Sequence, residues 1–194
     1  MITASQVNEL RQITGVGMME CKKALTEAAG DMAKAADILR KSGAAKAAKR
    51  ADKEAKEGTI GVYIHSNNKI ATMVELNCET DFVARNDEFI ALAKELAMQV
   101  AAMNPKYVRP EEVPAEELAK EQEIYRAQLK EEGKPAEIVE KILAGKVDKY
   151  YSQVCLLKQP SIKDDKTTAE KLINGLVAKI GEKVEIGRVF RIEI

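Results

Sequence analysis

The chain has 194 residues, of which 45% are hydrophobic, so it can bury a core and suits one or two domains. Its 31 basic and 31 acidic residues cancel, so no net charge draws it toward nucleic acid or an anionic membrane. We therefore expect its partner to be a protein or a small molecule, with no nucleic-acid or membrane partner.

Three cysteines, Cys21, Cys78 and Cys155, lie far apart without a Cys-x-x-Cys pair, and the only histidine is His65. This set cannot form a zinc site of ordinary ligand spacing, so we expect no metal, no cofactor, and buried thiols in a reducing compartment. The first residues lack the pattern of a signal peptide, and no run of about 18 apolar residues occurs. The sequence therefore predicts a cytoplasmic protein.

Residues 5 to about 54 are predicted to form three helices separated by glycine-containing turns. Ser5 is placed to cap the first helix, and Ile13 falls on its apolar stripe. A glycine ends the second helix, and Asp31 is placed to cap the third. The alanine-rich segment 46–56, which is mixed in charge, is interpreted as a solvated helical linker.

Alternating residues over 59–64 and 72–76, on either side of the polar loop 66–69, predict a β-hairpin. A third strand is predicted over 184–194, and helices should cover one face of the resulting antiparallel sheet. Arg188 falls on the apolar side of this strand, and the sequence offers no reason for it. That apolar side consists of Val184, Ile186, Phe190, Ile192 and Ile194.

Four further helices are predicted between the hairpin and the last strand. Their spans are about 87–103, 114–131, 135–157 with a break at Gly145 left open, and 168–180. Asn86 or Asp87 caps the first of them, and a capping box at Thr167-Thr168-Ala169-Glu170 begins the last, which Gly181 stops. The predicted fold class is α+β, with three helices followed by a three-stranded antiparallel sheet packed with helices.

The turn Thr80-Asp81-Phe82-Val83 joins the second strand to the next helix and carries one of only three phenylalanines. Its polar neighbours indicate that it faces water, which makes Phe82 a candidate wedge for burial in a partner. Alternatively, Phe82 folds back as a hydrophobic staple for the following helix. The residues alone leave both interpretations open.

The chain offers few activated groups for catalysis. His65 has no evident nucleophile beside it, Gly145-Lys146-Val147 lacks the leading glycine and the hydroxyl residue of a phosphate loop, and Gly15-Val16-Gly17 follows no strand. Many carboxylates stand four residues from lysines, as on solvated helix faces. We therefore expect a protein that is not an enzyme.

Three segments match the motifs of a known family. They are Leu10-Arg11-x-x-Thr14-Gly15-x-Gly17-Met18-Met19-Glu20-Cys21-Lys22-Lys23-Ala24-Leu25, Asn77-Cys78-Glu79-Thr80-Asp81-Phe82-Val83-Ala84-Arg85, and Ala178-Lys179-Ile180-Gly181-Glu182. The chain resembles bacterial elongation factor Ts over essentially its whole length. Members of that family are guanine-nucleotide exchange factors for the translational GTPase elongation factor Tu.

The resemblance implies a ubiquitin-associated-like docking domain over residues 1–54 and a core, dimerisation module over 55–194. It also implies that the turn Thr80-Asp81-Phe82-Val83 displaces magnesium from the nucleotide site of elongation factor Tu, which is bound in its GDP-bound and nucleotide-free states. Asp81 and Phe82 would enter between partner helices. Further implied contacts are Arg11, Met18, Met19, Ile180 and Gly181. From the residues alone, the two methionines could equally belong to the three-helix core.

Longer members of the family carry a second core half and a coiled-coil protrusion, whereas this chain has room for one core module. It looks like the short form, in which a homodimer supplies the second surface. Some short members join that dimer through a cysteine in the last strand, but Val189-Phe190-Arg191 contains none. The resemblance therefore implies a non-covalent homodimer, with the edge and apolar face of the terminal strand as contacts.

Two rival interpretations stay open. In the first, the chain is a protein-binding adaptor that uses its three-helix module to hold a ligand without any effect on nucleotides. In the second, Lys46, Lys49 and Arg50 bind RNA, which the zero net charge disfavours.

Overall fold

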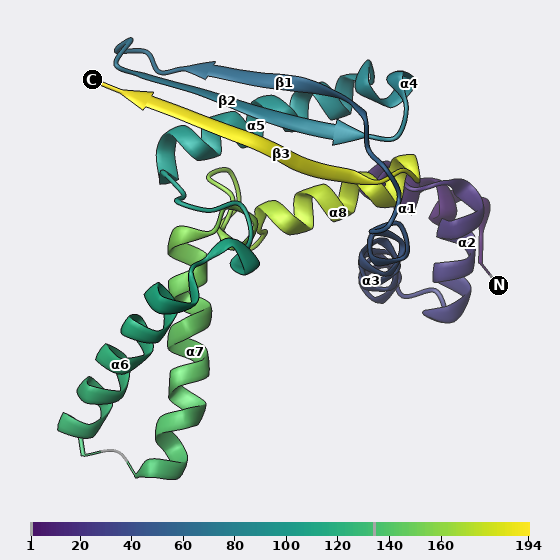
Figure 1. Cartoon of the computed structure of the whole chain (residues 1–194). Helices are drawn as coiled ribbons and strands as arrows, with labels where there is room; N and C mark the ends of the chain where they lie inside the picture. The colour runs from purple at the N-terminus through teal and green to yellow at the C-terminus, as the bar shows by residue number, and fades with distance from the viewer. Residues whose placement is uncertain (1, 134) are drawn as a thin grey trace.

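A computed structural model describes residues 2–133 and 135–194 (Figure 1). The chain begins with helices α1 (Ala4–Thr14), α2 (Met18–Glu27) and α3 (Met32–Lys49), followed by strands β1 (Glu57–Ile64) and β2 (Ile70–Cys78). Helices α4 (Asp81–Ala84), α5 (Asp87–Met103), α6 (Ala115–Glu131), α7 (Ala136–Val154) and α8 (Ala169–Ile180) then lead to strand β3 (Val184–Glu193). Short 3-10 turns occur at η1 (Pro110–Glu112) and η2 (Leu156–Lys158). Within the described ranges, no helix combines the length and apolar character needed to cross a bilayer.

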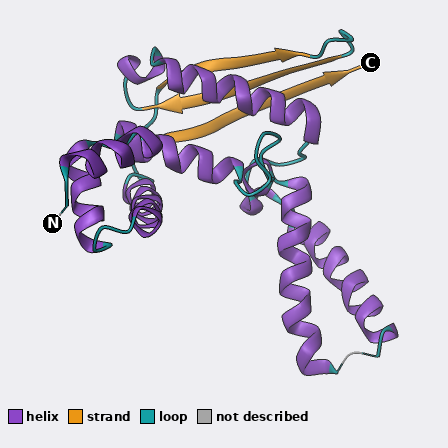
Figure 2. Cartoon of the chain, turned by 180° about the vertical axis from the view of Figure 1, so that it is seen from behind, coloured by secondary structure: helices purple, strands orange, loops and turns teal. Residues whose placement is uncertain are grey.

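The three strands form an antiparallel sheet in the order β1-β2-β3. Helices α5 and α8 lie on one side of this sheet (Figure 2). Between the layers lies an apolar core in which Val74 and Leu76 of β2, Phe89 and Leu96 of α5, and Val177 of α8 are fully buried. The predicted α+β fold class is confirmed.

A bulge in β3 explains why Arg188 interrupts the apolar pattern of this strand. Gly187 and Arg188 together stand opposite Glu75 of β2, and the Arg188 Nε donates to Oε2 of Glu75 at 2.7 Å. The extra residue reverses which side chains face the helices, so Phe190 and Ile192 are exposed. The prediction that all the apolar residues of this strand share one side is therefore wrong beyond the bulge.

The three N-terminal helices enclose an apolar cluster of their own. Thr3, and not Ser5 as predicted, caps α1: its Oγ1 accepts from the N–H of Gln6 at 3.2 Å, and its N–H donates to Oε1 of Gln6 at 3.0 Å. This reciprocal capping box needs a Glu or Gln three residues on, which Thr3 has. Asp31 is confirmed as the cap of α3, since its Oδ1 accepts from the N–H of Lys34 at 3.0 Å.

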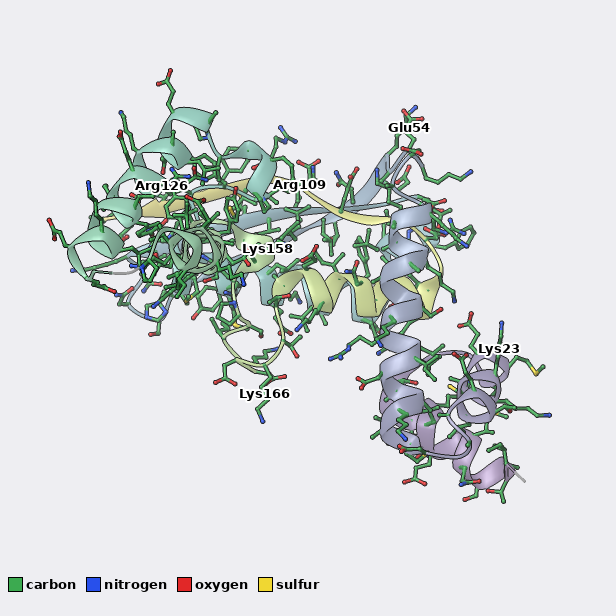
Figure 3. The ribbon with its side chains drawn as sticks, turned by 90° about the horizontal axis from the view of Figure 1, so that it is seen from below. Lys23, Glu54, Arg109, Arg126, Lys158 and Lys166 are labelled. Carbon is green, nitrogen blue, oxygen red and sulfur yellow. The ribbon has the colours of Figure 1, made fainter. Side chains whose placement is uncertain are left out.

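Helix α3 connects these N-terminal helices to the end of the sheet (Figure 3). It packs along α8, where a Cβ added to Gly43 would stand 2.8 Å from the Cβ of Ala178. Further along, Ala47 packs against the core of the sheet. The prediction of a solvated helical linker over 46–56 is therefore right only in part: most of these residues are exposed, but Ala47 is packed and the helix ends at Lys49.

Helices α6 and α7 form a hairpin that projects from the rest of the molecule (Figures 1 and 2). Helix α7 runs through Gly145 without a break. At the base of the hairpin, Glu117 accepts hydrogen bonds from the hydroxyls of Tyr107 at 2.7 Å and Tyr150 at 2.6 Å, which lower the pKa of this carboxyl to about 2. The chain thus has a helical protrusion, a feature expected above only of longer relatives.

The start of α8 differs from the predicted capping box at Thr167-Thr168-Ala169-Glu170. Thr168 is the N-cap, and its Oγ1 accepts from the N–H of Lys171 at 3.3 Å. The third residue of the helix is therefore a lysine, which cannot return the bond to the cap. Glu170 instead pairs with Lys158 at 2.8 Å and so joins α8 to η2.

We expect Gly43→Leu to weaken the attachment of α3 to α8, because the added side chain has no room between them. Overpacking of this kind lowers the free energy of unfolding by about 1 to 3 kcal/mol, which urea denaturation followed by circular dichroism measures. Gly145→Leu is the matched control, since it lies in a helix where nothing stands within 4 Å of an added Cβ. It should stabilise the protein by up to about 1 kcal/mol, and equal effects of the two changes would contradict the expectation.

Candidate partner-binding site

Helix α4 lies at the end of the sheet away from the C-terminus (Figure 1). The side chain of Phe82 is 84% exposed, whereas its neighbour Val83 packs against the core. Successive residues of a helix lie about 100° apart, so one can anchor the turn while the other points away. With this exposure the ring does not serve as a hydrophobic staple for α5, and that interpretation is wrong.

Two carboxylates tie the start of α4 to the start of β3. Glu182 accepts from the N–H of Thr80 at 3.1 Å and from its Oγ1 at 2.8 Å, using a different oxygen for each. In the opposite direction, Oε1 of Glu79 accepts from the N–H of Lys183 at 2.6 Å. These residues continue the register of β2 and β3 beyond their last backbone pair. Side-chain oxygens therefore replace carbonyl oxygens at the end of the ladder.

Glu79 also binds the end of α3. Arg50 donates from Nη1 to Oε1 of Glu79 at 2.6 Å, and the Nζ of Lys183 donates to the carbonyl of Lys53 at 2.9 Å. The hydrogen bond from the N–H of Lys183, helped by Arg50, holds the pKa of Glu79 below its usual value, although partial burial opposes the shift. The ends of α3, β2 and β3 thus meet at the base of α4.

The thiol of Cys78 lies beneath this junction in an environment that keeps it protonated. Burial, with the nearby charge of Glu182, raises the pKa of Cys78 to about 11, and its Sγ donates to the carbonyl of Thr80 at 3.2 Å. A thiol that stays protonated is a poor nucleophile. Cys21 and Cys155 are likewise buried and free, so the predicted burial of all three thiols is confirmed.

Asp81 occupies the first position of α4 and pairs with Arg85 one turn later, with 3.2 Å between Oδ2 and Nη2. The two side chains are 47% and 81% exposed, and such a pair contributes little to stability because water screens it. The carboxylate of Asp81 is therefore accessible to a partner beside the ring of Phe82.

Met18 and Met19 lie at the start of α2 and are 46% and 76% exposed, so they do not belong to the three-helix core. Arg11, in the last turn of α1, is also exposed. Ile13, which the helical spacing placed on the buried stripe, is 68% exposed, because Val16 closes the core after the turn. The end of α1 and the start of α2 therefore form an exposed surface with apolar side chains.

Ile180 and Gly181 end α8 between this surface and α4. Gly181 has a φ of 76° in the left-handed region, which ends the helix as predicted and turns the chain into Glu182. The side chain of Lys179 lies against Gly15 of the turn between α1 and α2, where an added Cβ would stand 2.5 Å from its Cε. The structure therefore gathers the site residues that the sequence indicated, from four separate segments, at one end of the molecule.

Comparison with known proteins agrees with the resemblance of the motifs. The family model described as Elongation factor TS matches residues 5–176. The chain is 54% identical over 190 residues to Elongation factor Ts of Geobacter sulfurreducens, which covers 98% of this chain and 88% of that protein. It is 56% identical over 194 residues to Elongation factor Ts of Moorella thermoacetica, covering 100% of this chain and 96% of that protein.

The chain belongs to the elongation factor Ts family. It is thus a translation elongation factor, which acts in protein biosynthesis. These two alignments cover 98% and 100% of this chain, so they include both the N-terminal helices and the sheet.

Glu79 and Glu182 were not among the predicted residues of this site, although both stand inside the matched segments. Each makes a bond to a residue more than 100 positions away, as the separations of 102 and 104 show, and spacing along the chain cannot reveal such a pair. The available signal was the placement of both acids at the facing ends of two predicted antiparallel strands.

Acid should loosen the junction at Glu79. Because its pKa in the folded protein is below the usual 4.5, the stability that it contributes is complete above that value and is lost as the pH falls through the lowered one. We expect Glu79→Gln to be less stable than the parent at neutral pH and to lose less stability between about pH 5 and pH 3. Urea midpoints measured against pH test this, and parallel curves for the two proteins would contradict it.

Proposed function

We propose that this elongation factor Ts family member is a guanine-nucleotide exchange factor for the translational GTPase elongation factor Tu. The observation that carries the proposal is Phe82, which is 84% exposed on a turn that is anchored through Thr80 and Val83. Aromatic side chains of this kind dominate the binding energy of protein interfaces. No covalent bond is made or broken in this exchange, so the proposed role is not that of an enzyme.

In the proposed mechanism the turn Thr80-Asp81-Phe82-Val83 promotes GDP release by displacing Mg²⁺ from the partner. Mg²⁺ bridges the β-phosphate and protein oxygens, so a movement of those oxygens weakens nucleotide binding without any contact to the nucleotide. Phe82, with Asp81 beside it, enters between helices of elongation factor Tu and moves them apart. The exposed ring of Phe82 and the accessible carboxylate of Asp81 support this assignment.

The rate increase expected from Phe82 alone shows whether further contacts with the partner are needed. Burying the ring of Phe82 is worth about 2 to 3 kcal/mol, and about 1.4 kcal/mol corresponds to a tenfold change in rate, so the wedge supplies about a hundredfold. A larger acceleration requires docking contacts. We assign these to a docking domain over residues 1–54 and to the end of α8, with the residues Arg11, Met18, Met19, Ile180 and Gly181.

Coupling between binding sites is reciprocal, so nucleotide with Mg²⁺ must weaken the hold of the factor by the same ratio as the factor weakens the nucleotide. The complex with nucleotide-free elongation factor Tu is then the tight one, and the complex with the GDP-bound form is short-lived. This makes the factor reusable during polypeptide elongation.

Binding of RNA by Lys46, Lys49 and Arg50 is disfavoured. Lys46 pairs with Glu20, and Arg50 pairs with Glu79, so two of the three cations already have acidic partners. Each would have to give up its partner to bind a phosphate.

We expect Phe82→Ala to bind elongation factor Tu and yet lose most of the stimulation of GDP release, because the docking surface remains while the wedge is gone. Stopped-flow release of fluorescent GDP measures the loss, which should approach about a hundredfold at saturating factor.

Ile124→Ala is the matched control, since it removes an isoleucine that is 49% exposed on α6, away from the site. It should stimulate like the parent, and excess Mg²⁺ should slow release with either protein. Full stimulation by the Phe82 variant would refute the wedge. Binding without any stimulation by the parent itself would favour the adaptor interpretation.

We further propose that the protein is a non-covalent homodimer joined through the face of the sheet opposite α5 and α8. This open face carries an unusual number of exposed apolar side chains, namely Ile60, Val62, Ile64, Met73, Phe190 and Ile192. Val62, Met73 and Phe190 stand side by side across the three strands, so the apolar surface is continuous. Contiguous apolar surface of this kind marks an interface, and a second copy brings a matching surface by symmetry.

We expect Met73→Glu to convert the dimer into a monomer, because it places a charge at the centre of the open face. Sedimentation velocity should show the mass halved while the circular dichroism spectrum stays unchanged. Ile138→Glu, at an exposed position on α7, is the control that should remain dimeric. A parent protein that sediments as a monomer would overturn this part of the proposal.

A further inference from the structure

The base of α4 is held by bonds that come from outside it. Helix α4 has four residues, too few to be stable alone, and its N-cap Thr80 makes no side-chain capping bond within the helix. Both donors of Thr80 point instead to the carboxylate of Glu182, at 3.1 Å from the N–H and 2.8 Å from Oγ1. The orientation of the turn that carries Phe82 therefore depends on a residue at the start of β3.

A second carboxylate completes the arrangement in the reverse direction. Glu79 accepts from the N–H of Lys183 and from Nη1 of Arg50, both at 2.6 Å. One acid thus reaches from β2 to β3, and the other reaches from β3 to the start of α4. Arg50 stands at the end of α3, so its bond to Glu79 also connects this arrangement to the helix that packs along α8.

We propose that Glu182 and Glu79 are positioning residues for the exchange reaction, which hold α4 so that Phe82 points away from its own core. Glu182 fixes the start of α4, and Glu79 fixes the distance between α4 and the N-terminal helices through Arg50. Neither acts on the nucleotide itself. The proposal rests on the proposed function, since it assigns how the wedge is kept in place.

The physical reason is the conformational entropy that a mobile turn would lose when it binds. A free turn would sample many orientations, and the ring of Phe82 would spend part of its binding energy on becoming fixed in the partner. A turn fixed in advance retains that energy for moving the partner's helices. Loss of the bonds should therefore lower the maximal rate of release more than it lowers the affinity of docking.

The experiment compares Glu182→Ala with Glu182→Gln in the full chain. Alanine removes both bonds to Thr80, whereas glutamine can accept from the N–H of Thr80 and donate to its Oγ1, so it preserves the geometry without the charge. With Glu182→Ala we expect the maximal rate of GDP release from elongation factor Tu to fall about tenfold, with the half-maximal concentration unchanged within about twofold. Glu182→Gln should restore most of the rate.

A second measurement reports on the free protein. The chain has no tryptophan, so Phe82→Trp introduces a single tryptophan at the tip of α4, whose emission can be excited apart from that of the five tyrosines. Its fluorescence anisotropy should show faster local motion when Glu182→Ala is added and little change with Glu182→Gln. Glu140→Ala, which removes an exposed ion pair with Arg126 on the hairpin, is the control and should leave both readouts unchanged.

The outcomes separate the two proposals. Unchanged anisotropy and an unchanged maximal rate in Glu182→Ala, with the thermal unfolding of the variant like that of the parent, would overturn the positioning role. Equal losses in Glu182→Ala and Glu182→Gln would also overturn it, because the geometry would then not be what matters. If the parent itself stimulates no release, the exchange function fails, while the anisotropy of the free protein still decides whether Glu182 holds α4.

Discussion

The close contact of α3 with α8 determines how the two halves of this molecule are placed. Gly43 allows the helices to approach until an added Cβ would stand 2.8 Å from Ala178. Because packed interiors tolerate little change of volume, this contact sets the position of α3 closely. The three N-terminal helices are thereby fixed relative to the sheet, and their exposed residues Met18 and Met19 take a defined position relative to α4.

From that contact follows the arrangement of the site. The end of α3 brings Arg50 to Glu79, and the end of α8 brings Glu182 to Thr80. Both bonds lie at the point where β2 and β3 cease to pair through their backbones. The proposed docking surface and the exposed ring of Phe82 are thus held on one frame, which is what the proposed exchange function needs if binding energy in one place is to produce movement in another.

The exposed apolar residues have separate structural origins. Phe82 is exposed because its neighbour Val83 takes the inward position in a one-turn helix. Phe190 and Ile192 are exposed because the bulge at Gly187 and Arg188 reverses the faces of β3. One turn and one extra residue therefore create a single projecting ring at one end of the molecule and a broad apolar face on the sheet.

The sequence by itself determined the order and type of the elements, since helical and alternating periods are local patterns, and its motifs indicated the family and the turn with Phe82. Predictions from local sequence patterns were wrong where burial depended on residues that are distant in the chain. They placed Ile13 in the core, although Val16 closes that core, and they extended a helical linker to residue 56, although the helix ends at Lys49 and Ala47 packs on the sheet. Only the tertiary structure decided which groups Glu79 and Glu182 bind and that the ring of Phe82 faces water. Those bonds join residues more than 100 positions apart, and contacts of that kind exist only once the strands have paired.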